Sequence, residues 1–521
     1  MFFLKQISHD HFIKMHPPTP LYSRSEIRKI ENLATTLTHI NGSGLMQKAG
    51  LAVAEIARDE IFKNGGQRVL ILAGSGNNGG DALVAARYLA AWWFTVTVVF
   101  AGEANKLSGD AKAAFDAWLN AGGRVMDDIP AHEKYDAIID GLFGIGLTCE
   151  LAGNYLRLVH TVNTLSAQHH VPVLAIDIPS GLNSDTGEMQ GAAIRANMTV
   201  TFIAIKPGLL LRHGKECCGE IILRTLDLDA PTLLQPRAWM LDQSYAMTLK
   251  LAPRIADSHK GDYGSVGILG GAMGMVGAAL LAGRAALKLG AGRVYVSLLA
   301  QETSPNTLAV DMQQLELMLR PAHELLQLEL SVIVAGSGMG DSAEAYTCLS
   351  KVLACAQPIV LDADALNLIA AHRTLAEILL QRAAQKIDTL LTPHPGEASR
   401  LLGISTAAVQ RDRVAAAILL AQQYKSYVVL KGAGSICALP TGEYFINSSG
   451  NPALASAGTG DVLTGIIGAF IAQKLTAQNA LLLAVYLHGQ AADVLVKNGI
   501  GPLGLTASEL IDAARNLINA K

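Results

Sequence analysis

The chain has 521 residues, too many for one ordinary hydrophobic core, so two or three domains are expected. Half of the residues are hydrophobic, 16% are charged and 50 are glycine, a profile typical of a soluble α/β protein and not of a disordered or fibrous chain. The formal net charge of -3 offers no electrostatic attraction for nucleic acid or an anionic membrane, so neither is expected as a partner.

The remaining bulk features indicate a cytoplasmic protein. The six cysteines include no Cys-x-x-Cys pair, which fits reduced thiols in a reducing compartment. Residues 1–20 lack the apolar core and cleavage site of a signal peptide. The apolar stretch 475–492 is interrupted by polar residues and predicts a buried core helix, not a membrane span.

The first half of the chain alternates apolar runs with amphipathic stretches. Helices are expected at residues 22–37 and 49–62, followed by a buried strand at 68–73. The loop Gly74-Ser-Gly-Asn-Asn-Gly-Gly-Asp81 joins this strand to a helix at 82–93, an order that places a phosphate at a helix N-terminus. The side-chain oxygens of the loop suit a hard cation or a ribose as readily as they suit a helix cap.

Polar residues follow three strands of this half. The other predicted elements are strands at 95–100, 135–140, 171–177 and 219–226 and a helix at 108–121. In a doubly wound sheet the carboxyl ends of the strands share one edge, where ligands bind. The residues expected to meet in that crevice are Asn77, Asn78, Asp81, Asp140, Asp177 and Ser180.

The motifs Gly-x-Gly-Asn-Asn-Gly-Gly-Asp, Asp-Gly-Leu-Phe-Gly-Ile-Gly and Asp-Ile-Pro-Ser-Gly, in this order, resemble the NAD(P)H-hydrate epimerase family, the YjeF N-terminal domain. The resemblance implies a Rossmann-like fold that binds hydrated NADH or NADPH, with Asp177 facing the reacting ring as the catalytic acid. It also implies a potassium ion held by Asn78, Asp140 and Ser180. Family members usually have glycine where this chain has Ala82. The residues implied to line the substrate are Asn77, Asn78, Gly79, Gly80, Asp81, Gly144, Ile145, Gly146, Leu147, Thr148, Cys149 and Glu150.

Epimerisation at C6 of the hydrated ring needs little catalytic machinery. The hydroxyl can leave to give an iminium, and water can add to the other face. A carboxylate such as Asp177 can shuttle the proton and stabilise the cation. Lys206 also ends a strand, and it either reaches this site or lies on the surface before a turn.

A domain boundary is expected where the alternation weakens, between residues 227 and 258. Residues 1–229 are assigned to the first domain and 230–521 to the second. The second half predicts a helix at 276–289 and strands at 265–269, 293–299, 331–335, 358–361, 389–391, 443–446 and from 427 into a glycine loop at 431–435.

The segment Ala457-Gly-Thr-Gly-Asp-Val-Leu-Thr-Gly465 is the most distinctive part of this half. Gly458 and Gly460 permit a tight turn, and Asp461 opens an apolar helix at 462–471 whose first N–H groups are free to bind an anion. One carboxylate beside an anion site suits the deprotonation of a hydroxyl that attacks a phosphoryl group. The structural alternative is an aspartate N-cap after a glycine turn.

The motifs His-Lys-Gly-x-x-Gly, Pro-His-Pro-Gly-Glu, Lys-Gly-Ala-Gly-Ser and Gly-Thr-Gly-Asp-Val-Leu-Thr-Gly resemble the ADP/ATP-dependent NAD(P)H-hydrate dehydratase family, which has the ribokinase-like fold. The resemblance implies that Asp461 is the catalytic base, that ADP or ATP is the co-substrate, and that Glu397 holds magnesium through water. The residues implied to bind the nucleotide or the hydrate are Ala279, Gly338, His394, Lys431, Gly432, Ala433, Gly434, Ser435 and Gly460.

With both motif sets in one chain, the sequence resembles the bifunctional NAD(P)H-hydrate repair family. The resemblance implies epimerisation of the R and S hydrates and ADP-dependent dehydration of the S hydrate to NAD(P)H, AMP and phosphate. Two alternatives stay open: a ribokinase-like vitamin or sugar kinase fused to a non-catalytic nucleotide-binding domain, and a non-catalytic binding module. Glycine- and alanine-rich helices permit close association of chains, and a homo-oligomer is expected.

Overall fold

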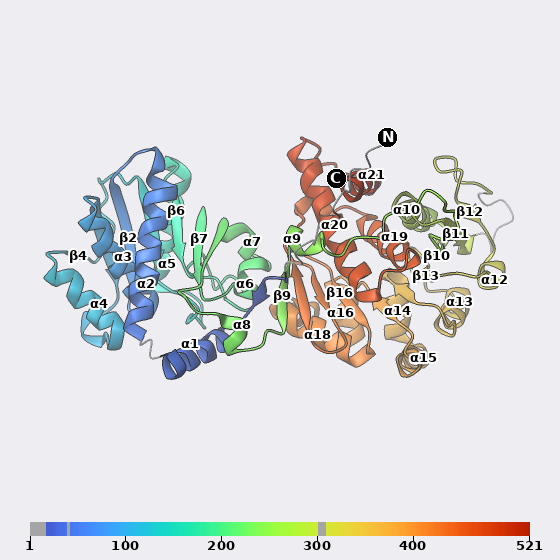
Figure 1. The fold of residues 1–521 in the computed structure, drawn as a ribbon, viewed down its shortest axis with the longest axis horizontal. Helices are drawn as coiled ribbons and strands as arrows, with labels where there is room; N and C mark the ends of the chain where they lie inside the picture. The colour runs from blue at the N-terminus through green and yellow to red at the C-terminus, as the bar shows by residue number, and fades with distance from the viewer. Residues whose placement is uncertain (1–16, 39–41, 301–308, 521) are drawn as a thin grey trace, which may run out of the picture.

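A computed structural model describes residues 17–38, 42–300 and 309–520 of the chain. Two α/β domains lie side by side along the long axis of the molecule, with the N-terminal half on one side and the C-terminal half on the other (Figure 1). Residues 1–16, most of the stretch in which no signal peptide is expected, lie outside the described residues.

Within the described residues, the first domain is built on a seven-stranded parallel sheet with the order β4-β3-β2-β5-β6-β7-β8. From β2 the chain forms β3 and β4 on one side and then returns to β5 on the other, so the strand order switches at the carboxyl ends of β2 and β5. The strands are β2 (Arg68–Gly74), β3 (Thr95–Ala101), β4 (Val125–Met126), β5 (Ala137–Gly141), β6 (Val173–Ile176), β7 (Met198–Phe202) and β8 (Glu220–Arg224).

Helices cover both faces of this sheet, which is why its central strands are apolar on both sides. One core cluster includes α1 (Arg24–Thr38), α2 (Gly42–Ile56), α3 (Asn77–Ala91) and α4 (Gly109–Asn120), and the other includes α5 (Gly153–His169). The predicted boundary of α3 was wrong. The helix begins at Asn77, and the Gly80 N–H donates to the Gly76 carbonyl, so the residues expected in a loop form its first turns.

The second domain is built on an eleven-stranded sheet with the order β1-β9-β18-β17-β16-β15-β14-β13-β10-β11-β12, counted in the described residues. The strands from β12 to β16 are parallel, and β17 and β18 continue the sheet as antiparallel hairpins. The order switches between β10 and β13. The strands are β10 (Ser265–Gly270), β11 (Arg293–Leu298), β12 (Met318–Leu319), β13 (Val332–Ala335), β14 (Ile359–Leu361), β15 (Thr389–Leu391), β16 (Tyr427–Leu430), β17 (Ile436–Ala438) and β18 (Tyr444–Asn447).

One face of this sheet is covered by α10 (Val276–Lys288), α19 (Thr459–Ala472), α20 (Ala477–Lys497) and α21 (Ala507–Asn519). The N-cap of α19 is Gly458, whose φ of 86° favours glycine. Asp461 therefore lies in the first turn of the helix, and the alternative that it is merely an N-cap is excluded. The other face is covered by α13 (Ala343–Leu353), α14 (Ala363–Ala371), α15 (Arg373–Ala384), α16 (Pro395–Leu402) and α18 (Arg413–Tyr424).

Helix α20 is long and apolar enough to cross a membrane by length and composition, but 72% of its most apolar window is buried inside the protein. It packs against α19 and α21 in the core. The prediction of a core helix is confirmed, and its apolar character follows from being covered on several sides.

Two short elements cross the predicted division at residues 229 and 230. Strand β1 (Pro20–Leu21) pairs with β9 (Ala238–Leu241) at the edge of the second sheet, although it precedes the first domain. Conversely, α8 (Ala230–Leu233) contacts α1, and Ala230 belongs to the core of the first domain. The two predicted α/β domains are present. Each packs against a short element from the other half of the chain: β1 joins the second sheet, and α8 packs on the first domain.

Candidate functional site

The first domain has a cavity of about 610 Å³ at the switch point of its sheet. The sequence-predicted residues that line it come from the start of α3, the loop after β5 and the end of β6. They are Asn77, Asn78, Asp81, Gly144, Ile145, Gly146, Leu147 and Asp177. The structure thus gathers these residues around one space, as expected for the carboxyl ends of neighbouring parallel strands.

Asp177 lies at this edge in an unusual conformation. Its φ is 65°, a left-handed value that non-glycine residues rarely adopt and that is often found at functional sites. The ammonium group of Lys206, which is 1% exposed, forms an ion pair with its carboxylate. The same ammonium donates to the hydroxyl of Thr201 and the carbonyl of Phe202, each at 2.9 Å. Lys206 is therefore a buried cation of the site and not a surface residue.

Two more carboxyl groups face this pair from other elements. Asp81 lies on α3 and Glu31 on α1, and both line the cavity. Burial raises the pKa of Asp81 well above its usual range, and the charges of Asp177 and Glu31 raise it further. The pKa of Glu31 is raised by burial and by Asp177. The cavity thus holds acids with different proton affinities, which is the arrangement proton transfer requires.

Asp140 and Ser180 are hydrogen-bonded to each other, and Asn78, which lines the cavity, lies beside Gly144 in the loop that follows β5. Asp140 is fully buried and accepts only from neutral donors among the described contacts: the Ser180 N–H and hydroxyl, at 2.8 and 2.6 Å, and the Leu142 N–H at 3.2 Å. Burial raises the pKa of Asp140 to about 6. A Cβ at Gly144 would lie 3.0 Å from Asn78 Oδ1, and the buried Asn78 Nδ2 has no hydrogen-bond partner in the described part of the chain. The buried carboxyl group of Asp140 has no positively charged partner among the described contacts, and the oxygens around it are the ligands that a hard cation prefers.

Five of the predicted lining residues lie elsewhere. Gly79 and Gly80 are buried behind the cavity, where glycine is needed for packing. A Cβ at Gly79 would lie 1.8 Å from the Gly74 carbonyl oxygen, and one at Gly80 would lie 2.6 Å from Met46 Cε. Residues 148–150 (Thr148, Cys149 and Glu150) are exposed and are not part of the cavity lining.

In the second domain, Asp461 and Gly460 lie in the first turn of α19. A Cβ at Gly460 would lie 3.2 Å from Lys431 Nζ and 3.3 Å from Asp362 Oδ2, so the glycine leaves room beside both charges. Burial raises the pKa of Asp461 to about 6, while the Ser337 hydroxyl lowers it and Asp362 raises it. At neutral pH this carboxyl group is largely ionised and has a proton affinity suited to a general base.

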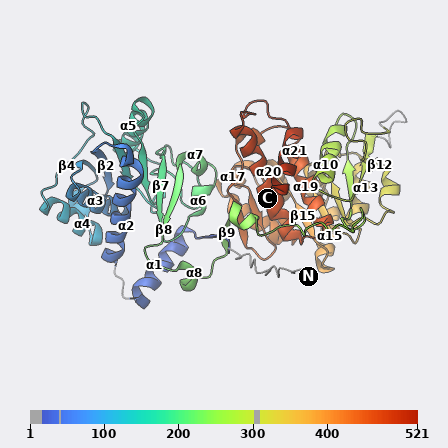
Figure 2. The ribbon, with the colours of Figure 1, turned by 45° about the horizontal axis from the view of Figure 1, so that its top comes forward.

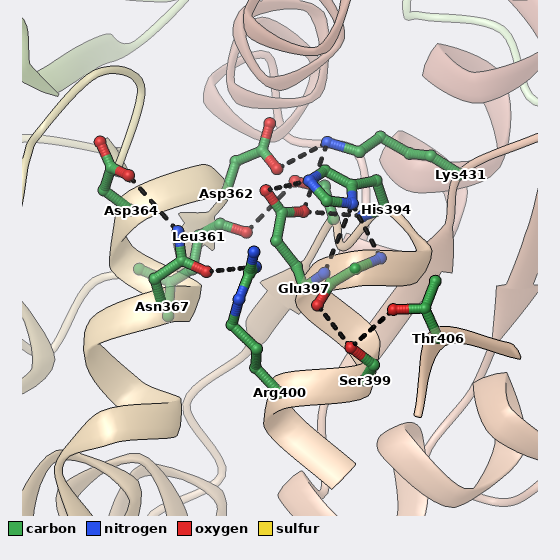
Figure 3. A network of polar contacts seen from close by, with 12 residues as sticks. Leu361, Asp362, Asp364, Asn367, His394, Glu397, Ser399, Arg400, Thr406 and Lys431 are labelled. Atoms are coloured by element: carbon green, nitrogen blue, oxygen red, sulfur yellow. Dashed lines mark hydrogen bonds and ion pairs between the residues drawn. The ribbon is translucent and has the colours of Figure 1, made fainter. Parts of the chain in front are cut away.

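Lys431 is the cation of this second site. Its ammonium group donates to Asp362 Oδ1 at 2.7 Å and lies 4.0 Å from Glu397 Oε2, and Figure 3 shows the lysine reaching across to these acids. Asp362 and Glu397 are 2% and 4% exposed. Burial raises the pKa of Glu397, and Asp362 raises it further while Lys431 lowers it. Asp362 directly follows β14, Glu397 lies in the first turn of α16, which comes after β15, and Lys431 directly follows β16. The segments after three adjacent parallel strands therefore build the cluster.

His394 has a structural role as well as its predicted one. Its Nδ1 accepts from the Gly396 N–H at 2.9 Å and the Glu397 N–H at 3.4 Å, and the backbone N–H of His394 donates to Glu397 Oε2 at 2.7 Å. This reciprocal cap begins α16. In the neutral imidazole, the proton must then be on Nε2, which lies 3.2 Å from Glu397 Oε1. The imidazole is half exposed beside Lys431 and Glu397 (Figure 3).

The predicted loop 431–435 (Lys431, Gly432, Ala433, Gly434 and Ser435) runs from β16 to β17. The buried guanidinium of Arg413 supports it from behind, donating to the carbonyls of Leu430 and Ala433. Gly432 and Ala433 are exposed, so their backbone can meet a ligand. This loop has the properties expected of an anion-binding turn.

The two remaining predicted residues of this site differ from each other. Gly338 follows β13 with a φ of 59°, and its neighbour Ser337 lies near Asp461, which places this glycine turn at the site. Ala279 is fully buried in the core cluster beneath α10, so its side chain offers no surface to a ligand. Its small size serves packing: a Cβ on Gly271 would lie 3.1 Å from the Ala279 Cβ.

Two charged residues of these sites, Asp362 and Glu31, were missed from the sequence as members of the constellations. Asp362 follows a predicted strand, and its position at the sheet edge was the available signal. The position of Lys206 at the end of a predicted strand was the signal that made it a candidate for the first site. Glu31 carried no signal, because it lies within an ordinary amphipathic helix that reaches the cavity only through the tertiary fold.

The fold and the two sites define a class of protein: a two-domain α/β enzyme whose sheets each bring a lysine–aspartate pair and further acids to one edge. Residues 42–208 match the family described as YjeF-related protein N-terminus, and residues 266–516 match the family described as NAD(P)H-hydrate dehydratase.

Similar full-length proteins are the bifunctional NAD(P)H-hydrate repair enzymes Nnr of Coxiella burnetii and Escherichia coli. The first is 39% identical over 96% of this chain and 100% of its own length, and the second is 36% identical over 98% and 96%. Among solved structures, an ADP/ATP-dependent NAD(P)H-hydrate dehydratase from Bacillus subtilis, co-crystallised with ATP and Mg²⁺, is 30% identical. It covers 53% of this chain and 96% of its own, with a TM-score of 0.45. The chain belongs to the bifunctional NAD(P)H-hydrate repair family, and the predicted pairing of an epimerase domain with a dehydratase domain is confirmed.

The pair of Lys206 and Asp177 generates a prediction about stability. Replacing Lys206 with Met leaves a mostly buried carboxylate without its partner, which destabilises the first domain by about 3–5 kcal/mol. Tryptophan fluorescence during urea unfolding measures this, because Trp92, Trp93 and Trp118 all lie in that domain. The control Lys106→Met breaks an exposed pair with Glu103 and should change stability by about 1 kcal/mol or less. Equal stabilities of the two variants would contradict the importance of the buried pair.

Proposed function

We propose that this chain repairs hydrated NADH and NADPH in two steps carried out by its two domains. The first domain interconverts the R and S hydrates, and the second converts the S hydrate and ADP to NAD(P)H, AMP and phosphate. The observation that carries the proposal is that one chain contains both family domains, each with its acid at the edge of its sheet.

In the first domain, Asp177 is the residue assigned to proton transfer at C6. It passes a proton to the departing hydroxyl, so that water and an iminium result. Water then adds to the opposite face and returns a proton to the carboxylate. The Lys206 ammonium holds the position of the carboxylate, and the neighbouring acids Asp81 and Glu31 are placed to exchange the proton.

In the second domain, Asp461 is assigned as the base that removes the proton of the C6 hydroxyl. The resulting oxygen attacks the terminal phosphorus of ADP, and AMP leaves. Loss of phosphate from C6 and of a proton from C5 then restores the nicotinamide ring. Lys431 and the first N–H groups of α19 provide positive charge for the phosphates, and phosphoryl transfer depends mainly on such positioning and charge. ATP is a second possible donor with the same terminal chemistry.

The metal ions are part of the proposal. Potassium is assigned to Asn78, Asp140 and Ser180, where it would compensate the buried charge of Asp140 and order the loop beneath the cavity. Magnesium would accompany the nucleotide. Both oxygens of Glu397 already face His394, so direct ligation of magnesium does not fit and only a water-mediated role suits this residue.

The rival kinase shares the site at Asp461 but predicts a different product. A kinase releases a stable phosphoester, whereas repair regenerates absorbance at 340 nm from hydrated NADH. The family membership of both halves supports repair over the kinase. Cytoplasmic location and homo-oligomerisation are further elements of the proposal, which fractionation and light scattering would test.

One test of the proposed function measures the dehydratase reaction. The purified chain incubated with hydrated NADH, ADP and Mg²⁺ should restore absorbance at 340 nm, and Asp461→Asn should lower this rate by two or more orders of magnitude while nucleotide binding is retained. Asp242→Asn, which alters a helix cap in the same domain, is the control. Near-normal turnover by Asp461→Asn, or a stable phosphoester as product, would refute the assignment.

The second prediction concerns the epimerase. Asp177→Asn keeps an oxygen that can accept from Lys206 but cannot carry the proton, so interconversion of the R and S hydrates should be abolished in a folded protein. Chromatographic separation of the two hydrates measures the rate. Asp128→Asn, at an exposed ion pair with Arg157, is the matched control. An unchanged rate in Asp177→Asn would remove this residue from the mechanism.

The third prediction concerns potassium. Replacing potassium with choline should slow epimerisation and lower the melting temperature of the first domain, because a cation that binds only the folded state stabilises it by mass action. At a concentration 100 times the dissociation constant, the effect is about 2.7 kcal/mol. Asp140→Asn should lose this response, and Asp128→Asn should retain it. The same melting temperature in both salts would count against the site.

A further inference from the structure

The two sites are connected by one short piece of chain, residues 206–217, which we term the bridging segment. It comprises Lys206, α6 (Pro207–Leu210), the turn at 211–213 and α7 (Gly214–Cys217). In both views of the ribbon, α6 and α7 lie on the side of the first domain that faces the second (Figures 1 and 2). The bridging segment begins with Lys206, the buried lysine of the first site.

The middle of the bridging segment contacts the loop 431–435 of the second site. The Arg212 N–H donates to the Ala433 carbonyl at 3.3 Å, and Arg413 of the second domain donates to the same carbonyl. A Cβ at Gly434 would lie only 2.3 Å from the Leu210 carbonyl oxygen. Gly434, with a φ of 66°, therefore lets the backbone of the first domain lie directly against the loop 431–435, so the first domain supports part of this loop.

The end of the segment contacts a second part of the same site. Lys215 Nζ donates to the carbonyls of Ser449 and Gly450, at 3.0 and 3.3 Å. These residues follow β18 and lead through a short 3₁₀ turn (Pro452–Leu454) to the start of α19, where Thr459 donates to the carbonyl of Leu454. Lys215 thus holds the chain that precedes Gly460 and Asp461.

The bridging segment is also packed too tightly to bend independently of its own domain. The Gly208 N–H donates to the Ser184 carbonyl at 2.7 Å, and a Cβ at Gly187 would lie 2.1 Å from the Leu211 carbonyl oxygen. Leu209, Leu210 and Leu211 belong to the core cluster that includes β16 and β17 of the second domain. Because packed cores deform little, a displacement at one end is passed to the other.

We propose that the bridging segment is a positioning element that the two sites share. Lys215 and the backbone of 210–212 set the geometry of the nucleotide loop, and nucleotide binding there is coupled to substrate binding beside Lys206. Because coupling between two binding events is reciprocal, nucleotide on the second domain must alter the affinity of the first domain for its hydrate by the same factor as the reverse. The inference rests on the proposed function for the identity of the two ligands.

The test uses the full-length chain and α,β-methylene ADP, which resembles ADP but cannot transfer its terminal phosphoryl group to the hydrate with loss of AMP. Calorimetry should show that Lys215→Met binds this analogue about tenfold more weakly, as expected if the loss of its two hydrogen bonds leaves the binding-competent arrangement populated in about a tenth of the molecules. With ADP as substrate, KM should rise while kcat changes little, since Lys215 touches neither substrate. Lys215→Arg should restore affinity, and Glu216→Gln, an exposed neighbour on α7, should bind as the wild type does.

Epimerisation provides the reciprocal measurement, because it takes place only in the first domain. Saturating analogue should change the KM of the wild type for the hydrate severalfold, and Lys215→Met should lose this response. Wild-type affinity for the analogue in Lys215→Met, or a wild-type KM that the analogue leaves unchanged, would overturn the inference. If Lys215→Met does not fold, Lys215→Gln takes its place. Absence of epimerisation in the wild type would refute the proposed function instead, and the calorimetric result would still decide the positioning role.

Discussion

Both sites depend on one constraint: in a buried parallel sheet, polar residues are confined to the ends of the strands, and the carboxyl ends of neighbouring strands lie at the same edge. Parallel strands covered by helices on both faces must be apolar along their length, so their polar residues are confined to the ends. In each sheet the strand order reverses at one point, between β2 and β5 and between β10 and β13. The loops diverge there, and the space between them is where side chains from several strands can surround a ligand.

Within this frame, the two sites use similar electrostatics for different chemistry. Each has a lysine paired with a buried aspartate, Lys206 with Asp177 and Lys431 with Asp362. Each also has a further carboxyl group whose pKa is raised, Asp81 in one and Asp461 in the other, and burial is the main cause in both. In each site the lysine fixes the position of its aspartate, and the carboxyl group with the raised pKa lies near this pair. The acid that pairs with lysine is the assigned proton carrier only in the first domain; in the second, the pair supports a separate base.

The fold was largely predictable from the sequence, because buried parallel strands leave apolar runs bounded by glycine and acid. The strands at 389–391 and 68–73 were placed to within one residue. Helix starts were less predictable: Asn77 and Gly79 look like loop residues, yet they form the first turn of α3 because its glycines pack against the strand end. The short strand β1 could not be foreseen, since its partner β9 lies more than two hundred residues further along the chain.

The site residues that lie in short sequence motifs were predictable, and those that depend on contacts with distant parts of the chain were not. Asp140, Asp177 and Asp461 follow strands or glycine turns, and the motif around each one marks it. Glu31 and the contacts of Lys215 depend on which helix face or turn meets a distant loop, and a local pattern does not encode that. The catalytic residues assigned to each domain lie in short motifs and can be found in the sequence. The contacts between the domains form only when the domains pack together, so no short motif marks them.

That packing gives a physical reason for the two domains to act as one molecule. Their boundary is crossed by β1, by α8 and by an apolar cluster that joins Ile178 and Leu182, just beyond Asp177, to the strands of the second sheet. An interface of this kind does not slide freely, since apolar side chains and backbone contacts such as that of Gly434 with Leu210 fix its register. The loop 431–435, to which nucleotide binding is assigned in the proposed function, is therefore supported by backbone contacts from the first domain. Lys206 and Arg212 are six residues apart in the bridging segment, so the proposed coupling has to cross only a short stretch of packed chain.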